Sequence, residues 1–200
     1  MRFFALLFST LVLCWFPAAG FAADRETEAA PQAEAVEPPS RAEQLDTLFG
    51  TLKSAKEEEA AKSAESDIIR LWLESGSDTV DLLMSWTLSA IEEKNYPLAL
   101  DYLDRMVVMK PDFPEAWNKR ATVHFLADDY SSAIADIERV LMLEPRHFGA
   151  LSGLGAIMRE IGEKERAIEA YRKALEVDPH LDNVKKALGD LEKEMAGREA

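Results

Sequence analysis

The residues best suited to chemistry lie in one stretch, WNKRATVHFLADDYSSAIADIERVLMLEP, residues 117–145. His124 precedes Asp128 by four residues, so a helix would place both side chains on one face. Asp129 and Asp136 follow closely. An imidazole among carboxylates can bind a divalent metal or exchange protons with a substrate. The alternative is that these residues belong only to a helix and a turn.

No other group of residues in the sequence offers a catalytic constellation. There is no G-x-S-x-G turn, no P-loop and no H-E-x-x-H helix. His147 and His180 follow Pro145 and Pro179 in expected loops, so we do not expect three ligands to converge. The acidic run at 57–59 suits the first turn of a helix, where it complements the dipole. We therefore expect no enzyme, no cofactor and no metal site.

The composition favours a helical protein, and its net negative charge disfavours binding to polyanions. Of the 200 residues, 48% are hydrophobic, and only nine are glycine and nine proline. Long stretches of Ala, Leu, Glu, Lys and Arg favour helix over strand. The formal net charge of −14 disfavours nucleic acid and anionic membrane surfaces as partners. A basic, apolar or amphipathic protein segment fits better.

The N-terminus has the three parts of a secretory signal. Arg2 is followed by an almost continuously apolar run over 3–16 and by small residues, which predicts cleavage after Ala22. The alternative is an uncleaved inner-membrane anchor, because the uncharged run over 3–23 is just long enough to span a bilayer. The single cysteine, Cys14, lies in this leader, so the mature chain has no disulfide and no thiol site. The periplasm is the compartment we expect.

A helix pair is expected at 41–78, after an Ala, Glu and Pro-rich linker. The sequence carries two capping boxes, Ser40 with Glu43 and Ser54 with Glu57, each followed by apolar residues at helical spacing. We expect this pair to cap the N-terminal end of the elements that follow.

From residue 80 onward the sequence repeats with a period of 34 residues. Pro111, Pro145 and Pro179 are separated by this interval. Three further columns keep the same spacing: Ala99, Ala133 and Ala167; Leu103, Ile137 and Tyr171; and Met106, Val140 and Ala174. Each unit has the pattern of two antiparallel helices whose apolar faces can be buried only by stacking.

The third unit, ALSGLGAIMREIGEKERAIEAYRKALEVDP, resembles a tetratricopeptide repeat. Leu154 and Gly155 match the L-G pair of that motif, and Ala167, Tyr171 and Pro179 match its second half. The first unit is the most divergent. The resemblance implies an all-α fold, a right-handed superhelical array of antiparallel helix pairs with an N-terminal helix pair and a C-terminal capping helix. The expected segments are a signal peptide (1–22), a disordered linker (23–40), a helix pair (41–78), three repeats (79–112, 113–146 and 147–180), and a capping helix with tail (181–200).

The resemblance also reinterprets the opening stretch. His124 stands where the motif has a Tyr, and Asp128 with Asp129 stands where the third unit has Gly162 and Glu163, at the turn between helices. Asp tolerates the turn conformations that Gly adopts. A structural role is therefore favoured for His124, and the enzyme with His124 and Asp128 is the least favoured alternative.

The resemblance implies a concave groove lined by the first helix of each repeat. Some members of the family hold an acidic C-terminal peptide there with a clamp of Lys, Asn and Arg; only Asn118 fits that clamp here. The helices at either end could also cover the groove. The expected partner-binding residues are Met84, Leu88, Ile91, Asn118, Thr122, Phe125, Ser152, Ala156 and Arg159.

These observations predict a non-catalytic protein-interaction module, a scaffold or adaptor of the bacterial cell envelope that binds a protein or peptide in its groove. The alternative is a self-associating structural oligomer with a covered groove, which an uncapped apolar face at one end of the array would favour. The amphipathic helix at 181–196 argues against open-ended stacking at the other end.

Overall fold

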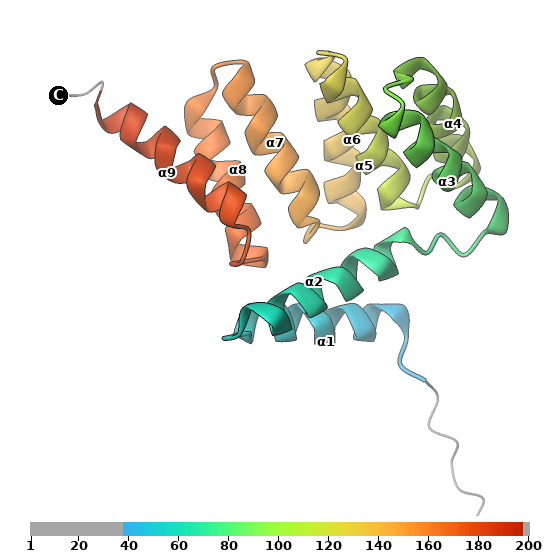
Figure 1. The fold of residues 1–200 in the computed structure, drawn as a ribbon, viewed down its shortest axis with the longest axis horizontal. Helices are drawn as coiled ribbons and strands as arrows, with labels where there is room; N and C mark the ends of the chain where they lie inside the picture. The colour runs from blue at the N-terminus through green and yellow to red at the C-terminus, as the bar shows by residue number, and fades with distance from the viewer. Residues whose placement is uncertain (1–37, 198–200) are drawn as a thin grey trace, which may run out of the picture. The chain divides into compact units, whose positions relative to one another are not determined.

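The computed structural model describes residues 38–197, which are entirely helical apart from their connections (Figure 1). The expected signal peptide and nearly all of the expected linker lie outside these residues. Over this range no helix combines the length and apolar character needed to cross a bilayer. The helices are α1 (Arg41–Ser54), α2 (Glu58–Leu73), α3 (Asp78–Glu92), α4 (Tyr96–Met109), α5 (Pro114–Leu126), α6 (Tyr130–Leu143), α7 (Phe148–Glu160), α8 (Lys164–Val177) and α9 (Asp182–Ala196).

Three helix pairs, α3–α4, α5–α6 and α7–α8, form the first, second and third repeats and stack in chain order (Figure 1). Lys94, Asp128 and Gly162 occupy equivalent positions in the turns within the repeats, with φ of 57°, 59° and 86°. Asp129 then caps α6 by accepting a hydrogen bond from the backbone N–H of Ser132 (3.1 Å). The expected turn at Asp128 and Asp129 is confirmed, and Asp128 adopts the left-handed conformation of Gly162.

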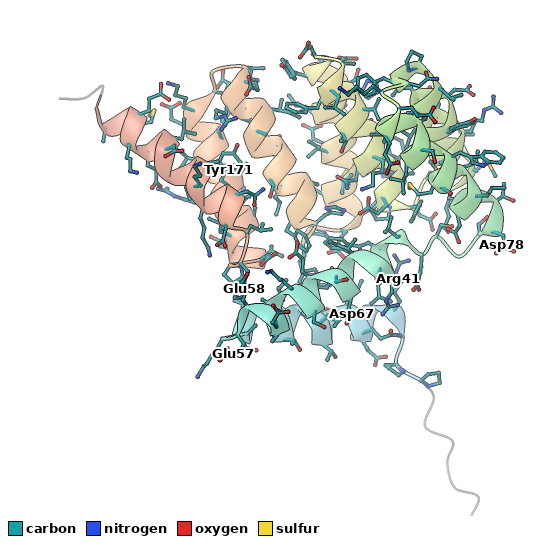
Figure 2. The ribbon with its side chains drawn as sticks, in the orientation of Figure 1. Arg41, Glu57, Glu58, Asp67, Asp78 and Tyr171 are labelled. Carbon is teal, nitrogen blue, oxygen red and sulfur yellow. The ribbon has the colours of Figure 1, made fainter. Side chains whose placement is uncertain are left out.

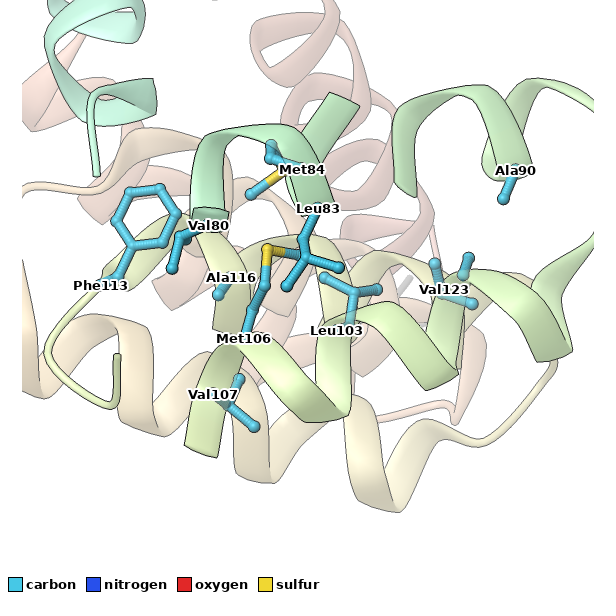
Figure 3. Close-up of a cluster of buried hydrophobic side chains, with 11 residues drawn as sticks. Val80, Leu83, Met84, Ala90, Leu103, Met106, Val107, Phe113, Ala116 and Val123 are labelled. Carbon is cyan, nitrogen blue, oxygen red and sulfur yellow. The ribbon is translucent and has the colours of Figure 1, made fainter. Parts of the chain in front are cut away.

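A small residue on the first helix of a repeat allows the second helix to approach closely, as the third repeat shows. In the third repeat, a Cβ added to Gly155 would lie 2.5 Å from ring atoms of Tyr171 on α8, which Figure 2 labels. The second repeat has the smaller Ile137 at the Tyr171 position and Ala121 at the glycine position. The first repeat packs its own cluster between α3 and α4, including Leu83, Leu103 and Met106 (Figure 3).

Replacing Gly155 with alanine is expected to lower the free energy of unfolding by about 1–2 kcal/mol. Overpacking against the Tyr171 ring costs about 1–3 kcal/mol, and the better helix propensity of alanine offsets up to about 1 kcal/mol of it. Urea titration of the single variants and of Gly155→Ala/Tyr171→Ile would measure the coupling. The second substitution should relieve the loss, since Ala with Ile is the native pair of the second repeat. Additive losses would contradict this account.

The beginning of α1 follows the sequence, whereas the beginning of α2 does not. Ser40 and Glu43 form the expected capping box. The second expected capping box was wrong: Ser54 ends α1 and donates its hydroxyl to the carbonyl of Gly50 (2.8 Å), and Glu57 precedes α2 without a side-chain cap. Because the hydroxyl finds an acceptor inside α1, it is not available to the following helix.

The position of the N-terminal hairpin, α1 with α2, also differs from expectation. It does not cap the N-terminal end of the array but lies along one edge of it (Figure 1). Its apolar residues pack with Phe148 at the start of α7, Val177 at the end of α8 and Leu181 just before α9. The two ends of the third repeat therefore supply apolar partners for the hairpin. At the other end α9 packs as expected, with Val184 and Leu191 buried in the cluster of the third repeat.

Candidate functional site

An apolar hollow of about 160 Å³ lies between the second and third repeats. It exists because four of the five α7 residues that line it, Gly149, Ala150, Gly153 and Ala156, are small. We call it the α5–α7 hollow, and its lining comprises Asn118, Ala121, Thr122, Phe125, Ile137, Gly149, Ala150, Gly153, Ala156 and Ile157. In the described part of the chain, no residue of α1, α2 or α9 contributes to this lining, so the terminal helices leave it open.

A second hollow, of about 390 Å³, lies beside α3. We call it the α3 hollow; it is more polar, since Asp81 and Glu92 contribute to its lining. Leu88 is 40% exposed there, whereas Met84 is only 4% exposed because most of it belongs to the core of the first repeat. Met84 therefore offers much less surface than a groove residue should.

The structure divides the nine expected groove residues. Asn118, Thr122, Phe125 and Ala156 meet at the α5–α7 hollow, and Met84 and Leu88 meet at the α3 hollow. The other three lie outside the two linings: Ile91 packs half-buried against the first repeat, Ser152 donates its hydroxyl to the carbonyl of Phe148, and Arg159 pairs with Glu160. Six of the nine expected groove residues therefore line two hollows, and the role of all nine in binding a partner stays a prediction.

His124 and the aspartates around it are held by structural contacts. His124 Nδ1 lies 3.5 Å from Asp129 Oδ2, and its Nε2 lies 3.9 Å from Asp136 Oδ2. Arg120 already holds both oxygens of Asp136, at 2.7 and 2.8 Å. Asp128 accepts a hydrogen bond from the hydroxyl of Tyr130 instead of meeting His124. Over the described residues no three His, Cys, Asp or Glu side chains are arranged to hold a metal ion.

A buried polar contact that the sequence analysis missed joins the second and third repeats. His147 is 2% exposed and caps α7 by accepting the backbone N–H of Ala150 at Nδ1 (3.1 Å). Since Nδ1 accepts, Nε2 is the nitrogen that donates to Glu115 Oε1 (3.2 Å). The indole of Trp72 stacks on this imidazole at 4.2 Å and 9°. A histidine two residues after a repeat-ending proline, just before the next helix, was the only available signal.

The charge of Glu115 is well compensated despite its burial. Burial raises the pKa of Glu115, but the hydrogen bond with His147, the positive charge of Lys119 (3.6 Å) and the amide of Asn118 (3.0 Å) outweigh it. Together they hold the pKa of Glu115 at about 2. The Asn118 amide is thus already committed to a neighbouring carboxylate, which reduces what it can offer a ligand in the α5–α7 hollow.

The lowered pKa makes Glu115 a source of acid sensitivity. Its contribution to folding is fully present above the ordinary value of 4.5 and is lost as the pH falls toward about 2. We expect Glu115→Gln to be about 3 kcal/mol less stable than the wild type at neutral pH, with the difference shrinking to little near pH 2. Urea titrations across this pH range would measure it.

The matched control is Glu138→Gln, on the exposed side of α6. Burial raises the pKa of Asp178 and of Glu65. These raised pKa values change the pH dependence of stability in the opposite direction to Glu115, but by the same amount in every variant. The difference between variants therefore isolates Glu115. A Glu115→Gln chain as acid-sensitive as the wild type would contradict the assignment.

The stacked helix pairs and their open hollows define an all-helical repeat protein of the protein-interaction class. The chain belongs to the tetratricopeptide repeat family: family models for this repeat match residues 88–141 and 148–181. A TPR repeat-containing protein of Rhizobium etli is 38% identical over 203 residues, which cover 98% of this chain and 97% of the relative.

Two solved structures share the fold. The first TPR of Spaghetti (RPAP3), bound to the HSP90 peptide SRMEEVD, has a TM-score of 0.57 and 20% identity, covering 58% of this chain and 93% of that chain. MamA has a TM-score of 0.57 and 22% identity, covering 72% of this chain and 88% of that chain. At these identities the likeness concerns the fold alone.

Proposed function

We propose that this chain is a non-catalytic adaptor that binds a protein segment by accepting one of its apolar side chains in the α5–α7 hollow. The observation that carries the proposal is the apolar hollow itself, floored by Gly149, Ala150, Gly153 and Ala156 and left open by the terminal helices. A cavity of roughly 150 Å³ accommodates a benzene ring, so the hollow suits one aromatic or branched side chain.

The polar rim would orient the rest of the ligand. Thr122 is exposed beside the hollow, and the half-buried Phe125 provides an adaptable apolar wall. An amphipathic segment that lays its apolar side into a groove is a common mode of peptide recognition.

An acidic peptide fits this chain poorly. The net charge is −14, the α3 hollow is flanked by Asp81 and Glu92, and the Asn118 amide is bound to Glu115. We propose an apolar, amphipathic or basic segment as the partner. Titration with the peptide SRMEEVD should therefore give no saturable binding, while the first TPR of Spaghetti serves as the positive control. Saturable binding would overturn this choice of partner chemistry.

Filling the hollow tests the site directly. A photo-crosslinking residue at Thr122 of the full chain should capture a defined partner in cells, and the same residue at Glu138 on α6 should not. Ala156→Phe, which fills the hollow, should abolish the crosslink. Ala135→Phe adds the same ring at an exposed position on α6 and should leave it unchanged. A crosslink that survives Ala156→Phe would exclude the hollow as the binding site.

We further propose that the adaptor works in the bacterial cell envelope, in the periplasm. The support is the leader pattern at 1–22 and the position of the only cysteine within it. Intact-mass analysis of the chain recovered from osmotic-shock fluid should give an N-terminus at Ala23. A chain that keeps residue 1 in the membrane fraction would support the uncleaved anchor instead.

A further inference from the structure

Within residues 38–197, the first repeat carries an apolar face at the end of the array that no other helix covers. Leu82 and Trp86 on α3 are 49% and 47% exposed, and Leu98 on α4 is 37% exposed. The rings of Trp86 and Tyr102 lie 5.8 Å apart. We call these four residues the end face. Because the N-terminal hairpin lies along the edge of the array, it leaves this end open (Figure 1).

The same positions in the next repeat form an established interface. Ala116 stands 34 residues after Leu82 and is fully buried in the core cluster of the first repeat. Arg120 stands 34 residues after Trp86, and its Nη1 donates to Asp104 on α4 (2.8 Å). The end face is therefore continuous in register with the surface on which one repeat stacks upon another.

The end face differs from that interface in chemistry. Where the second repeat has the ion pair of Arg120 with Asp136, the first repeat has the aromatic pair of Trp86 with Tyr102. A terminal repeat exposed to water is expected to be polar on its outer side. The first repeat is instead more apolar at these positions than the second.

A second copy of this chain is the occupant that the geometry favours. A hollow of about 250 Å³ lies on the end face beside Trp86, with Glu93 as the only charged residue in its lining. A projecting side chain next to a hollow is self-complementary under two-fold rotation. At the opposite end of the described array, α9 exposes Lys185, Lys186 and Lys193, so it offers a charged outer side to a head-to-tail neighbour.

We propose that the end face is a homodimer interface. Two copies pack their end faces together about a two-fold axis, so that the Trp86 side of one copy meets the Trp86 side of the other. A two-fold dimer is a closed assembly that adds no further copies. It leaves both α5–α7 hollows free. The dimer presents two ligand sites, but its formation does not depend on the proposed peptide binding. Because only four apolar side chains make up the end face, we expect a dissociation constant in the micromolar range.

Sedimentation equilibrium of the full chain, from about 1 μM to 1 mM, tests the proposal. A monomer–dimer equilibrium is expected, and Trp86→Glu or Leu82→Glu should weaken it at least tenfold. The control is Val108→Glu, which adds the same charge at an 80% exposed apolar position of α4. Its equivalent in the second repeat, Met142, is also exposed, so this position lies outside the stacking interface.

The outcomes are distinct. A monomer at every concentration, a dimer unchanged by both end-face variants, or growth beyond the dimer would each overturn the proposal. Circular dichroism melting confirms that the variants fold, and two independent positions guard against a local defect. Ala156→Phe should leave the dimer intact, so failure of the peptide site and failure of the dimer can be told apart.

Discussion

Replacing His147 with alanine is expected to lower the free energy of unfolding by about 3–5 kcal/mol. The substitution removes the N-cap of α7, the ring stacked on Trp72 and the donor to Glu115. The largest loss comes from Glu115, whose carboxylate stays buried with fewer hydrogen bonds. Since a domain is stable by only about 5–15 kcal/mol, the loss should be plain in a urea titration.

Two further variants show which contacts account for the stability that His147→Ala loses. His147→Asn keeps a good N-cap residue and should regain about 1 kcal/mol relative to alanine. His124→Ala is the matched control, because His124 is only partly buried and its contacts with Asp129 and Asp136 are long. We expect it to cost less than about 1 kcal/mol. If His147→Ala and His124→Ala lowered the free energy of unfolding equally, the contacts of His147 would not be the stabilising ones.

Replacing Trp72 with alanine is expected to release the N-terminal hairpin. Trp72 is 2% exposed and contacts Phe49, His147 and Phe148, with ring centroids at 6.0, 4.2 and 5.0 Å. Removing a buried tryptophan costs about 3–5 kcal/mol. Because Trp72 contacts rings both within the hairpin and at the start of the third repeat, the loss should fall mainly on the docking of the hairpin.

Hydrogen exchange would distinguish release of the hairpin from global unfolding. In Trp72→Ala we expect amides of α1 and α2 to exchange much faster, while α5 to α8 remain protected. Ile69→Ala, three residues before Trp72 and on the more exposed side of α2, should change little. Equal acceleration in all helices would show that the hairpin and the repeats unfold as one unit.

The repeat architecture was predictable because it depends on local, periodic features. The 34-residue spacing of Pro111, Pro145 and Pro179 and the apolar faces between them predict helix pairs, and helix pairs of this kind must stack. The turn at Asp128 followed from the same register. Each of these features can be read within one or two units of sequence.

The docking of the hairpin was not predictable in the same way. Nothing within residues 41–78 indicates that Trp72 will meet His147, because the two come from different units and their contact has no periodic signature.

The distribution of the expected groove residues over two hollows could not be predicted for a related reason. Helical spacing places Met84 on the correct face, but its depth depends on how closely α2 and α4 approach α3.

The long-range ties of the hairpin have a consequence for how the chain is made. A repeat array usually folds through contacts between neighbours, so its contact order is low. Here Arg146 binds Asp46 (2.6 Å) across 100 residues, and His180 Nε2 contacts the Leu52 carbonyl (3.1 Å) across 128 residues. The hairpin is synthesised first, but its docking surface is completed only when residues near 181 have emerged. During synthesis the apolar side of the hairpin has no docking partner until the third repeat has been made. We expect docking of the hairpin to be the slowest step of folding and the step at which aggregation begins.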